Sequence, residues 1–272
     1  MMRSWNLLLV ALIVSIATCS QTGGRRGDRD AFEIKQSVFF ADGSLDEYTT
    51  SQWDSSFVHI DKQVKHSASG TLLEQVDFTY NDDKGGYVTT KITRDVESRL
   101  KNRVVFQYNP QNLLIRESIV DNKGKVVSTY EYSYDGRGNC ISRVIKNRAG
   151  DKLAETTYTY NNQNKRVTSQ TSDFMASAIS STQYSYDSQG NMVRQVVMGG
   201  DGKPTTTINA IWQDGREISN EMLAADGSRQ MRITNEYGEF GELVKKTIEN
   251  YQGNSKQVMQ YEYTFRPARR QG

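Results

Sequence analysis

Residues 129–139 read Thr-Tyr-Glu-Tyr-Ser-Tyr-Asp-Gly-Arg-Gly-Asn, and residues 182–191 repeat the pattern as Thr-Gln-Tyr-Ser-Tyr-Asp-Ser-Gln-Gly-Asn. In both stretches tyrosines alternate with other residues, which predicts strands whose tyrosines share one face. An Asp follows the last tyrosine and can open a turn, because its carboxylate accepts backbone N–H groups two residues further on. The Gly three residues after the Asp can adopt a positive φ and complete a type I turn with a G1 bulge. Each stretch therefore predicts a strand that ends in a tight hairpin turn.

Aromatic residues continue at the same phase on both sides of these two copies. They are spaced 25 to 28 residues apart and comprise Trp53, Tyr80, Tyr108, Tyr134, Tyr160, Tyr186, Trp212, Tyr237 and Tyr263. A set of glycines runs in the opposite phase within turn-like sequences and comprises Gly70, Gly124, Gly150, Gly202, Gly227 and Gly253. A unit of about 26 residues thus holds two strands and two turns.

These repeats predict an all-β fold. We expect an antiparallel meander of about 26-residue hairpin repeats that forms a curled or single-layer sheet of about sixteen to eighteen strands, with a barrel or a solenoid as the alternative. A hydrophobic content of 36% favours a thinly covered sheet over a deep core. The β-hairpin repeat domain is assigned to residues 48–265, an N-terminal cap to 31–47 and a basic tail to 266–272.

The polar residues of the two best turns are interpreted as structural. They are Asp135, Gly138, Asn139, Asp187, Gly190 and Asn191. The two aspartates could instead be metal ligands or catalytic acids. Their recurrence at turn positions favours the structural interpretation, because a catalytic residue is normally single whereas a turn residue recurs with its turn.

The first eighteen residues have the features of a signal peptide. Arg3 supplies a positive charge, and the apolar run over residues 7–17 is shorter than the roughly 20 residues that a membrane span needs. Residues Ile16-Ala17-Thr18-Cys19 resemble a bacterial lipobox, which implies cleavage before Cys19 and lipid attachment to it. Thr18 departs from the small residue usual before the cysteine, and ordinary cleavage with a soluble product is the alternative. Residues 19–30 predict a flexible tether.

The two complete repeat copies also carry a family resemblance. Residues 132–139 and 184–191 resemble the YD repeat of Rhs and teneurin-type proteins, in which tyrosine–aspartate hairpins build long curling sheets on cell surfaces. Tyr108 and Tyr160 are followed by Asn in place of Asp, and Trp212 and Tyr237 keep only the aromatic residue and a nearby glycine. The resemblance implies a hairpin architecture and a surface role, and it transfers no activity.

Nothing in the sequence selects an active site, and we expect no enzymatic activity and no cofactor. The two histidines, His59 and His66, lie in an early hairpin and are interpreted as surface residues. There is no metal-ligand cluster, P-loop, dinucleotide fingerprint or nucleophile elbow. Cys140 is the only cysteine after Cys19 and is interpreted as a small buried hydrophobe. The net charge of +2 gives no basic face for nucleic acid, so no such partner is expected.

Two classes of function remain open. The first is an envelope-anchored, surface-exposed or periplasmic lipoprotein that binds protein or glycan in an adhesion-like role, held at the membrane through Cys19. The second is a structural or assembly factor of the envelope that uses its sheet edges; a hydrolase of envelope polymers ranks below both. Ser20 after the cysteine resembles an outer-membrane sorting signal, and a periplasmic or secreted protein is the alternative. The tyrosine rows could form a binding surface or simply pack along the sheet.

Overall fold

The computed structural model describes residues 31–53, 59–81 and 86–265 and shows eighteen strands. They are β1 (Ala31–Phe39), β2 (Leu45–Trp53), β3 (Ile60–Ser67), β4 (Leu72–Tyr80), β5 (Val88–Arg94), β6 (Leu100–Tyr108), β7 (Leu114–Val120), β8 (Val126–Tyr134), β9 (Cys140–Asn147), β10 (Lys152–Tyr160), β11 (Arg166–Asp173), β12 (Ala178–Tyr186), β13 (Met192–Met198), β14 (Pro204–Gln213), β15 (Arg216–Ala224), β16 (Arg229–Tyr237), β17 (Leu243–Asn250) and β18 (Ser255–Phe265).

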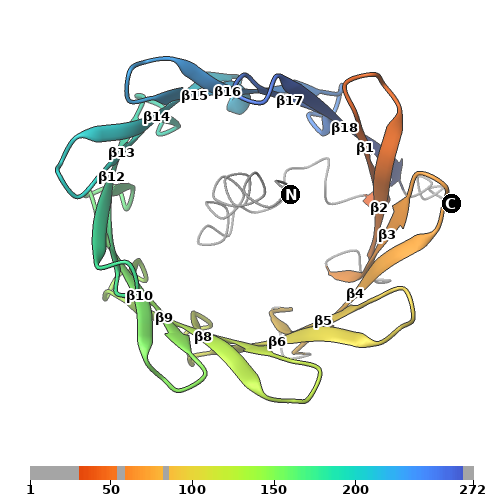
Figure 1. Cartoon of the computed structure of the whole chain (residues 1–272), viewed down its shortest axis with the longest axis horizontal. Coiled ribbons are helices and arrows are strands. Elements are labelled where there is room, and N and C mark those ends of the chain that lie inside the picture. Colours follow the sequence, from red (N-terminus) through yellow and green to blue (C-terminus); the bar gives the residue numbers. More distant parts are fainter. Residues whose placement is uncertain (1–30, 54–58, 82–85, 266–272) are drawn as a thin grey trace, which may run out of the picture.

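The strands form one closed antiparallel barrel (Figure 1). Each strand pairs with its neighbours in the chain, and β1 pairs with both β2 and β18. The predicted all-β antiparallel meander is therefore confirmed, in the form of its barrel alternative. Eighteen strands about 4.8 Å apart and tilted by about 40° make a ring roughly 35 Å across from backbone to backbone.

The first described strand closes the ring. Residues 31–47, expected to cap the sheet, contain β1, a turn and the first residues of β2. In β1, Ile34 lies opposite Tyr263 of β18 on one side and opposite Ser51 of β2 on the other. Closure pairs every described strand on both sides, which removes the exposed edges that an open sheet of this size would carry.

Most of the hairpin turns share one geometry. At residues 135–139 the Asp135 N–H donates to the Asn139 carbonyl at 2.9 Å, and the Gly138 N–H donates to the Asp135 carbonyl at 3.0 Å. Gly138 has a φ of 82°, which is unfavourable for a residue with a side chain. The strand register shifts at this turn, so Tyr134 lies opposite Cys140. This is the type I turn with a G1 bulge that the sequence predicts.

The barrel wall is a single layer and has no thick core. Few described hydrophobic side chains are buried, and they are spread around the ring: Val38, Val76, Val120, Cys140, Met222, Met231 and Ile233. The last three form a cluster with Met222 in β15 and Met231 and Ile233 in β16, against which Ile208 and Ile248 pack. The low hydrophobic content therefore supports one small buried cluster and scattered buried side chains on both faces of the wall.

Candidate functional site

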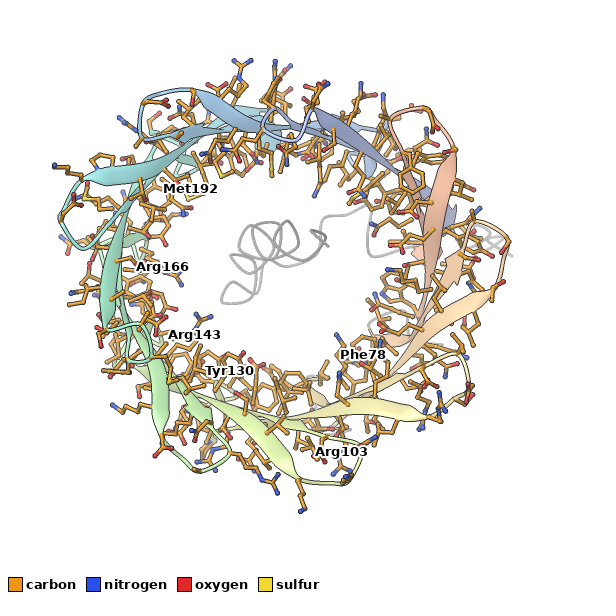
Figure 2. The ribbon with its side chains drawn as sticks, in the orientation of Figure 1. Phe78, Arg103, Tyr130, Arg143, Arg166 and Met192 are labelled. Atoms are coloured by element: carbon orange, nitrogen blue, oxygen red, sulfur yellow. The ribbon has the colours of Figure 1, made fainter. Side chains whose placement is uncertain are left out.

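The inner face of the barrel is the candidate site. Figure 2 shows five labelled side chains that point into the ring, namely Phe78, Tyr130, Arg143, Arg166 and Met192. Arg103 lies on the outer side. Residues directly opposite each other on neighbouring antiparallel strands share a face, so the strand registers carry these assignments around the ring. The inward side chains line the wall and do not meet across the ring in Figure 2.

Aromatic side chains are concentrated on the inner face. Tyr130 and Tyr132 of β8 lie opposite Ile145 and Arg143 of β9. Continuing through the registers, the inward aromatic residues on β8, β10 and β12 are Tyr130, Tyr132, Tyr134, Tyr158, Tyr160, Tyr184 and Tyr186. Between them lie inward hydroxyl-bearing residues of β10 to β12, namely Thr156, Thr171, Ser169, Ser180 and Thr182. This part of the wall offers flat rings, hydroxyl groups and two arginines.

A second part of the inner wall is apolar. Gln195 of β13 lies opposite the inward Tyr184 and so faces the lumen. Ile208 of β14 lies opposite Gln195, and Met222 of β15 lies opposite Ile208, so both share this inner face. Met222 in turn lies opposite Met231, and Ile233 opposite Ile248. The lumen therefore has a hydroxyl-rich aromatic side around β8–β13 and an aliphatic side around β14–β17.

Eight of the nine repeat aromatics, all except Trp53, occupy one repeated position. Each lies within the last three residues of an even-numbered strand and donates a hydrogen bond to a backbone carbonyl twenty residues earlier, in the first two residues of the preceding strand. The donor–acceptor pairs are Tyr80–Ile60, Tyr108–Val88, Tyr134–Leu114, Tyr160–Cys140, Tyr186–Arg166, Trp212–Met192, Tyr237–Glu217 and Tyr263–Leu243, at 2.6 to 2.9 Å. Burial raises the pKa of the Tyr108 and Tyr186 phenols, which keeps these donors protonated. The repeat aromatics thus tie one rim of the barrel together.

The two best-matching turns lie just beyond this rim. Asp135 Oδ1 accepts the N–H groups of Arg137 and Asn139, and its Oδ2 accepts the Asn139 side-chain amide. Asp187 holds Asn191 in the same way, with Gly190 at a φ of 83°. The hydrogen bond from the asparagine side chain lowers the pKa of each aspartate. The structure thus places these carboxylates in separate turns, where each one is engaged by its own turn.

Arg143 and Arg166 are the inward-facing cations of the aromatic side. The Arg166 guanidinium lies 4.3 Å from the centre of the Tyr158 ring and 6.0 Å from that of Tyr184. Burial acts to lower the pKa of Arg166, but its hydrogen bond with Tyr160 and the nearby phenols outweigh burial and raise the pKa. Among the residues that the structure describes, no carboxylate forms an ion pair with either arginine.

Three buried polar atoms in this region have no hydrogen-bond partner within the described part of the chain. They are Nε of Arg143, Nε of Arg166 and Oε1 of Gln195. Gln195 lies directly opposite Tyr184, whose hydroxyl is 3.2 Å from Ser169 Oγ. Leaving such groups unpaired is costly, so they mark a place where a ligand could supply the missing bonds.

The outer face is different and carries ion pairs between neighbouring strands. They include Arg116–Glu131 at 2.8 Å and Lys146–Glu131 at 2.6 Å. Others are Lys35–Glu262, Arg94–Asp77, Arg229–Glu221, Lys245–Glu236 and Lys256–Glu249.

The part of the chain that the structure describes contains no helix able to cross a membrane.

The remaining residues singled out from the sequence lie apart from this site. Cys19 and the tether lie outside the described residues. Cys140 is buried at the start of β9, where its carbonyl accepts the Tyr160 hydroxyl. His66 stacks on Tyr48 at 4.9 Å, and His59 lies 4.3 Å from the Tyr80 ring. No group of three His, Cys, Asp or Glu residues able to hold a metal occurs within residues 31–53, 59–81 and 86–265.

The described residues form a closed eighteen-strand barrel with an aromatic lumen, and this defines the structural class of the protein. Comparison with known proteins finds solved structures that resemble this fold only distantly. No family model and no curated protein matches the chain. A porin-like protein from Bacteroides uniformis is 12% identical, with a TM-score of 0.43, and the match covers 86% of this chain and 98% of that one. A Tc holotoxin pore of Photorhabdus luminescens is 10% identical, with a TM-score of 0.32, over 84% of this chain and 16% of that one. A LolA superfamily protein from Nitrosomonas europaea is 12% identical, with a TM-score of 0.24, and the match covers 88% of this chain and 87% of that one.

The resemblance to the YD repeat of Rhs and teneurin-type proteins is wrong as a family assignment. No family model for such repeats matches the chain. The tyrosine–aspartate pairs have a local cause instead. The tyrosine ends a strand and reaches a neighbouring carbonyl, and the next residue opens a tight turn.

Proposed function

We propose that the chain is an exported binding protein of the cell envelope that holds a glycan against the inner wall of its barrel. The observation that carries this proposal is the placement of the tyrosine rows. They face the lumen, together with serine and threonine hydroxyls, while most of the ion pairs between neighbouring strands face outward. The Lys65–Glu47 pair, at 2.7 Å, is an exception and lies on the inner face of β3 and β2, away from the tyrosine rows of β8 to β12. Tyrosine rings give large contact areas at low entropic cost, and hydroxyl groups match the hydrogen-bonding groups of sugars.

The charged side chains of the outer face support the proposal that water surrounds the barrel. A barrel that spans a membrane carries an outward apolar band flanked by aromatic residues. Here most of the aromatic residues of the strands line the inside, with Tyr48 an exception on the outer face. The outer wall carries Arg94, Arg103, Arg116, Glu131 and Lys146. Closure of the ring weakens the alternative function as an assembly factor. That function would need an exposed sheet edge, and the described strands leave none for a partner strand to join.

Ligand binding in the lumen can be followed by intrinsic fluorescence. The registers place Trp53 and Trp212 on the inner face, and the Trp212 indole donates to the Met192 carbonyl at 2.9 Å. We expect at least one member of a panel of neutral and acidic oligosaccharides to change the tryptophan emission in a saturable way. Tyr184→Ala should weaken that binding at least tenfold, whereas the outward variant Ile211→Ala should leave it unchanged. A panel without any effect on emission would refute a glycan-binding lumen.

Attachment to the membrane is a separate part of the proposal and has its own test. A protein lipidated at Cys19 should take up labelled fatty acid in a bacterial host and partition into the membrane fraction. The Cys19→Ser variant should lose the label, because it lacks the thiol that the lipid modifies. Equal labelling of the variant, or a soluble and unlabelled wild-type protein, would contradict the anchor and favour a periplasmic or secreted protein.

A further inference from the structure

We propose that the inner wall between β8 and β13 recognises the carboxylate of an acidic sugar, through Arg143 and Arg166. This inference rests on the proposed glycan-binding function and specifies the class of glycan. It starts from the three unpartnered polar atoms of this region. The Nε atoms of the two arginines require acceptors, whereas Oε1 of Gln195 requires a donor. A ligand that completes the site must therefore offer both, as a sugar with carboxylate and hydroxyl groups does.

The arrangement of these groups favours an extended ligand that lies across the strands. Arg143 of β9 lies opposite Thr156 of β10, and Arg166 of β11 lies opposite Tyr160. Tyr184 of β12 lies between Arg166 and Gln195 of β13. Figure 2 shows both arginines pointing into the lumen from the same side of the ring. Neighbouring strands are about 4.8 Å apart, so five strands present a strip about 19 Å wide, long enough for several sugar units.

The charges of this strip call for an anionic ligand. The acidic groups nearest in sequence are engaged elsewhere: Glu131 and Glu155 face outward and pair with Lys146 and Lys152. On the inner side, Glu117 accepts the Tyr132 hydroxyl at 2.6 Å. The two guanidinium groups thus lack a carboxylate partner among the described residues. Arginine binds carboxylates through paired N–H donors, and this interaction becomes stronger where water is partly excluded.

The surrounding wall favours a sugar over an acyl chain. Between the arginines lie the hydroxyl groups of Thr156, Thr171 and Ser169 and the faces of Tyr158 and Tyr184. The apolar face of a sugar ring packs on such aromatic rings, while its hydroxyl groups bond to the polar neighbours. An acyl chain would instead suit the Met222, Met231 and Ile233 wall on the other strands.

The test uses the full-length protein and acidic oligosaccharides with matched neutral forms. The probes are oligogalacturonate, alginate and hyaluronan fragments, each beside its methyl ester, which removes the charge and keeps the sugar. Binding is measured by tryptophan emission. We expect at least one acid form to bind tenfold or more tightly than its ester. Arg143→Gln and Arg166→Gln should each weaken that binding about tenfold, and the double variant should bind the acid no better than the ester. Arg103→Gln, on the outer face, should bind as the wild type does.

The outcomes separate this inference from the broader function. If neutral sugars bind as well as acidic ones and the arginine variants bind normally, the acidic-sugar inference fails while the glycan-binding lumen stands. If no oligosaccharide changes the emission, both fail. Binding of phosphatidylglycerol vesicles or of single-stranded DNA at Arg143 and Arg166, without binding of any uronate oligomer, would also overturn it. Thermal unfolding of each variant, monitored by circular dichroism, identifies any loss of binding that is due to misfolding.

Discussion

Replacing Met222 with aspartate is expected to lower the free energy of unfolding by about 4 kcal/mol. Met222 is 6% exposed and packs with Met231 and Ile233 on the inner wall. The substitution removes that packing and puts a carboxylate among aliphatic side chains. Because burial disfavours its charged form, the pKa of the new carboxyl should rise in the folded state. The destabilisation should therefore grow as the pH rises above about 4, where the unfolded chain is already ionised.

A matched substitution on the outer face gives the control for this prediction. Ile211 lies on β14, next to β15, and faces outward with 56% of its surface exposed. Ile211→Asp should change the free energy of unfolding by no more than about 0.5 kcal/mol, as exposed substitutions usually do. Urea denaturation of the two variants and the wild type at pH 7 measures the difference. Equal losses in both variants would contradict the assignment of inner and outer faces.

Much of the repeat can be predicted from local residue patterns. The alternation up to Tyr134 predicts a strand, and Asp135 with Gly138 predicts the turn, because both signals act within a few residues. The period of the aromatic residues predicts two strands per unit. The structure adds the reason for that period, since eight of the nine repeat aromatics reach a carbonyl twenty residues earlier, near the start of the preceding strand.

Closure depends on contacts that no local pattern contains. The pairing of β1 with β18 joins residues more than 200 positions apart, as in Lys35 and Glu262. Repeats of one kind extend equally well into an open sheet, a solenoid or a barrel. The choice follows from the accumulated curl of the whole sheet. Residues 31–39 lack the repeat pattern, which is why the sequence favours a cap there although the structure has a strand.

The candidate site could not be predicted from the sequence, because it too depends on closure of the barrel. Alternation shows that Tyr130 and Tyr132 share a face, but only closure shows that this face is the lumen. Arg143 and Arg166 are not marked by any motif. Their positions emerge from the register after each bulged turn, which places Arg143 opposite Tyr132 and Arg166 opposite Tyr160. A register worked out from the turn geometry could have placed both arginines with the tyrosines.

The second large effect is expected from a disulfide across the β1–β18 seam. Lys35 and Glu262 are directly opposite and form an outward ion pair at 3.6 Å. Opposed residues in antiparallel strands have Cα atoms about 4.5 to 5.5 Å apart, within the range that a disulfide spans. Constraining the unfolded chain from residue 35 to residue 262 should stabilise the protein by about 5 kcal/mol in the chain-entropy treatment.

The most direct test of the closed barrel is therefore to oxidise the Lys35→Cys/Glu262→Cys variant and to measure its cross-linking and its urea denaturation. The control is Glu249→Cys/Lys256→Cys, which joins another outward ion pair within the β17–β18 hairpin and should add only about 2.5 kcal/mol. A closed barrel predicts that both disulfides form in the folded protein and that the seam disulfide stabilises more. Formation of the hairpin disulfide without the seam disulfide would show an open sheet and would contradict a lumen lined by the tyrosine rows.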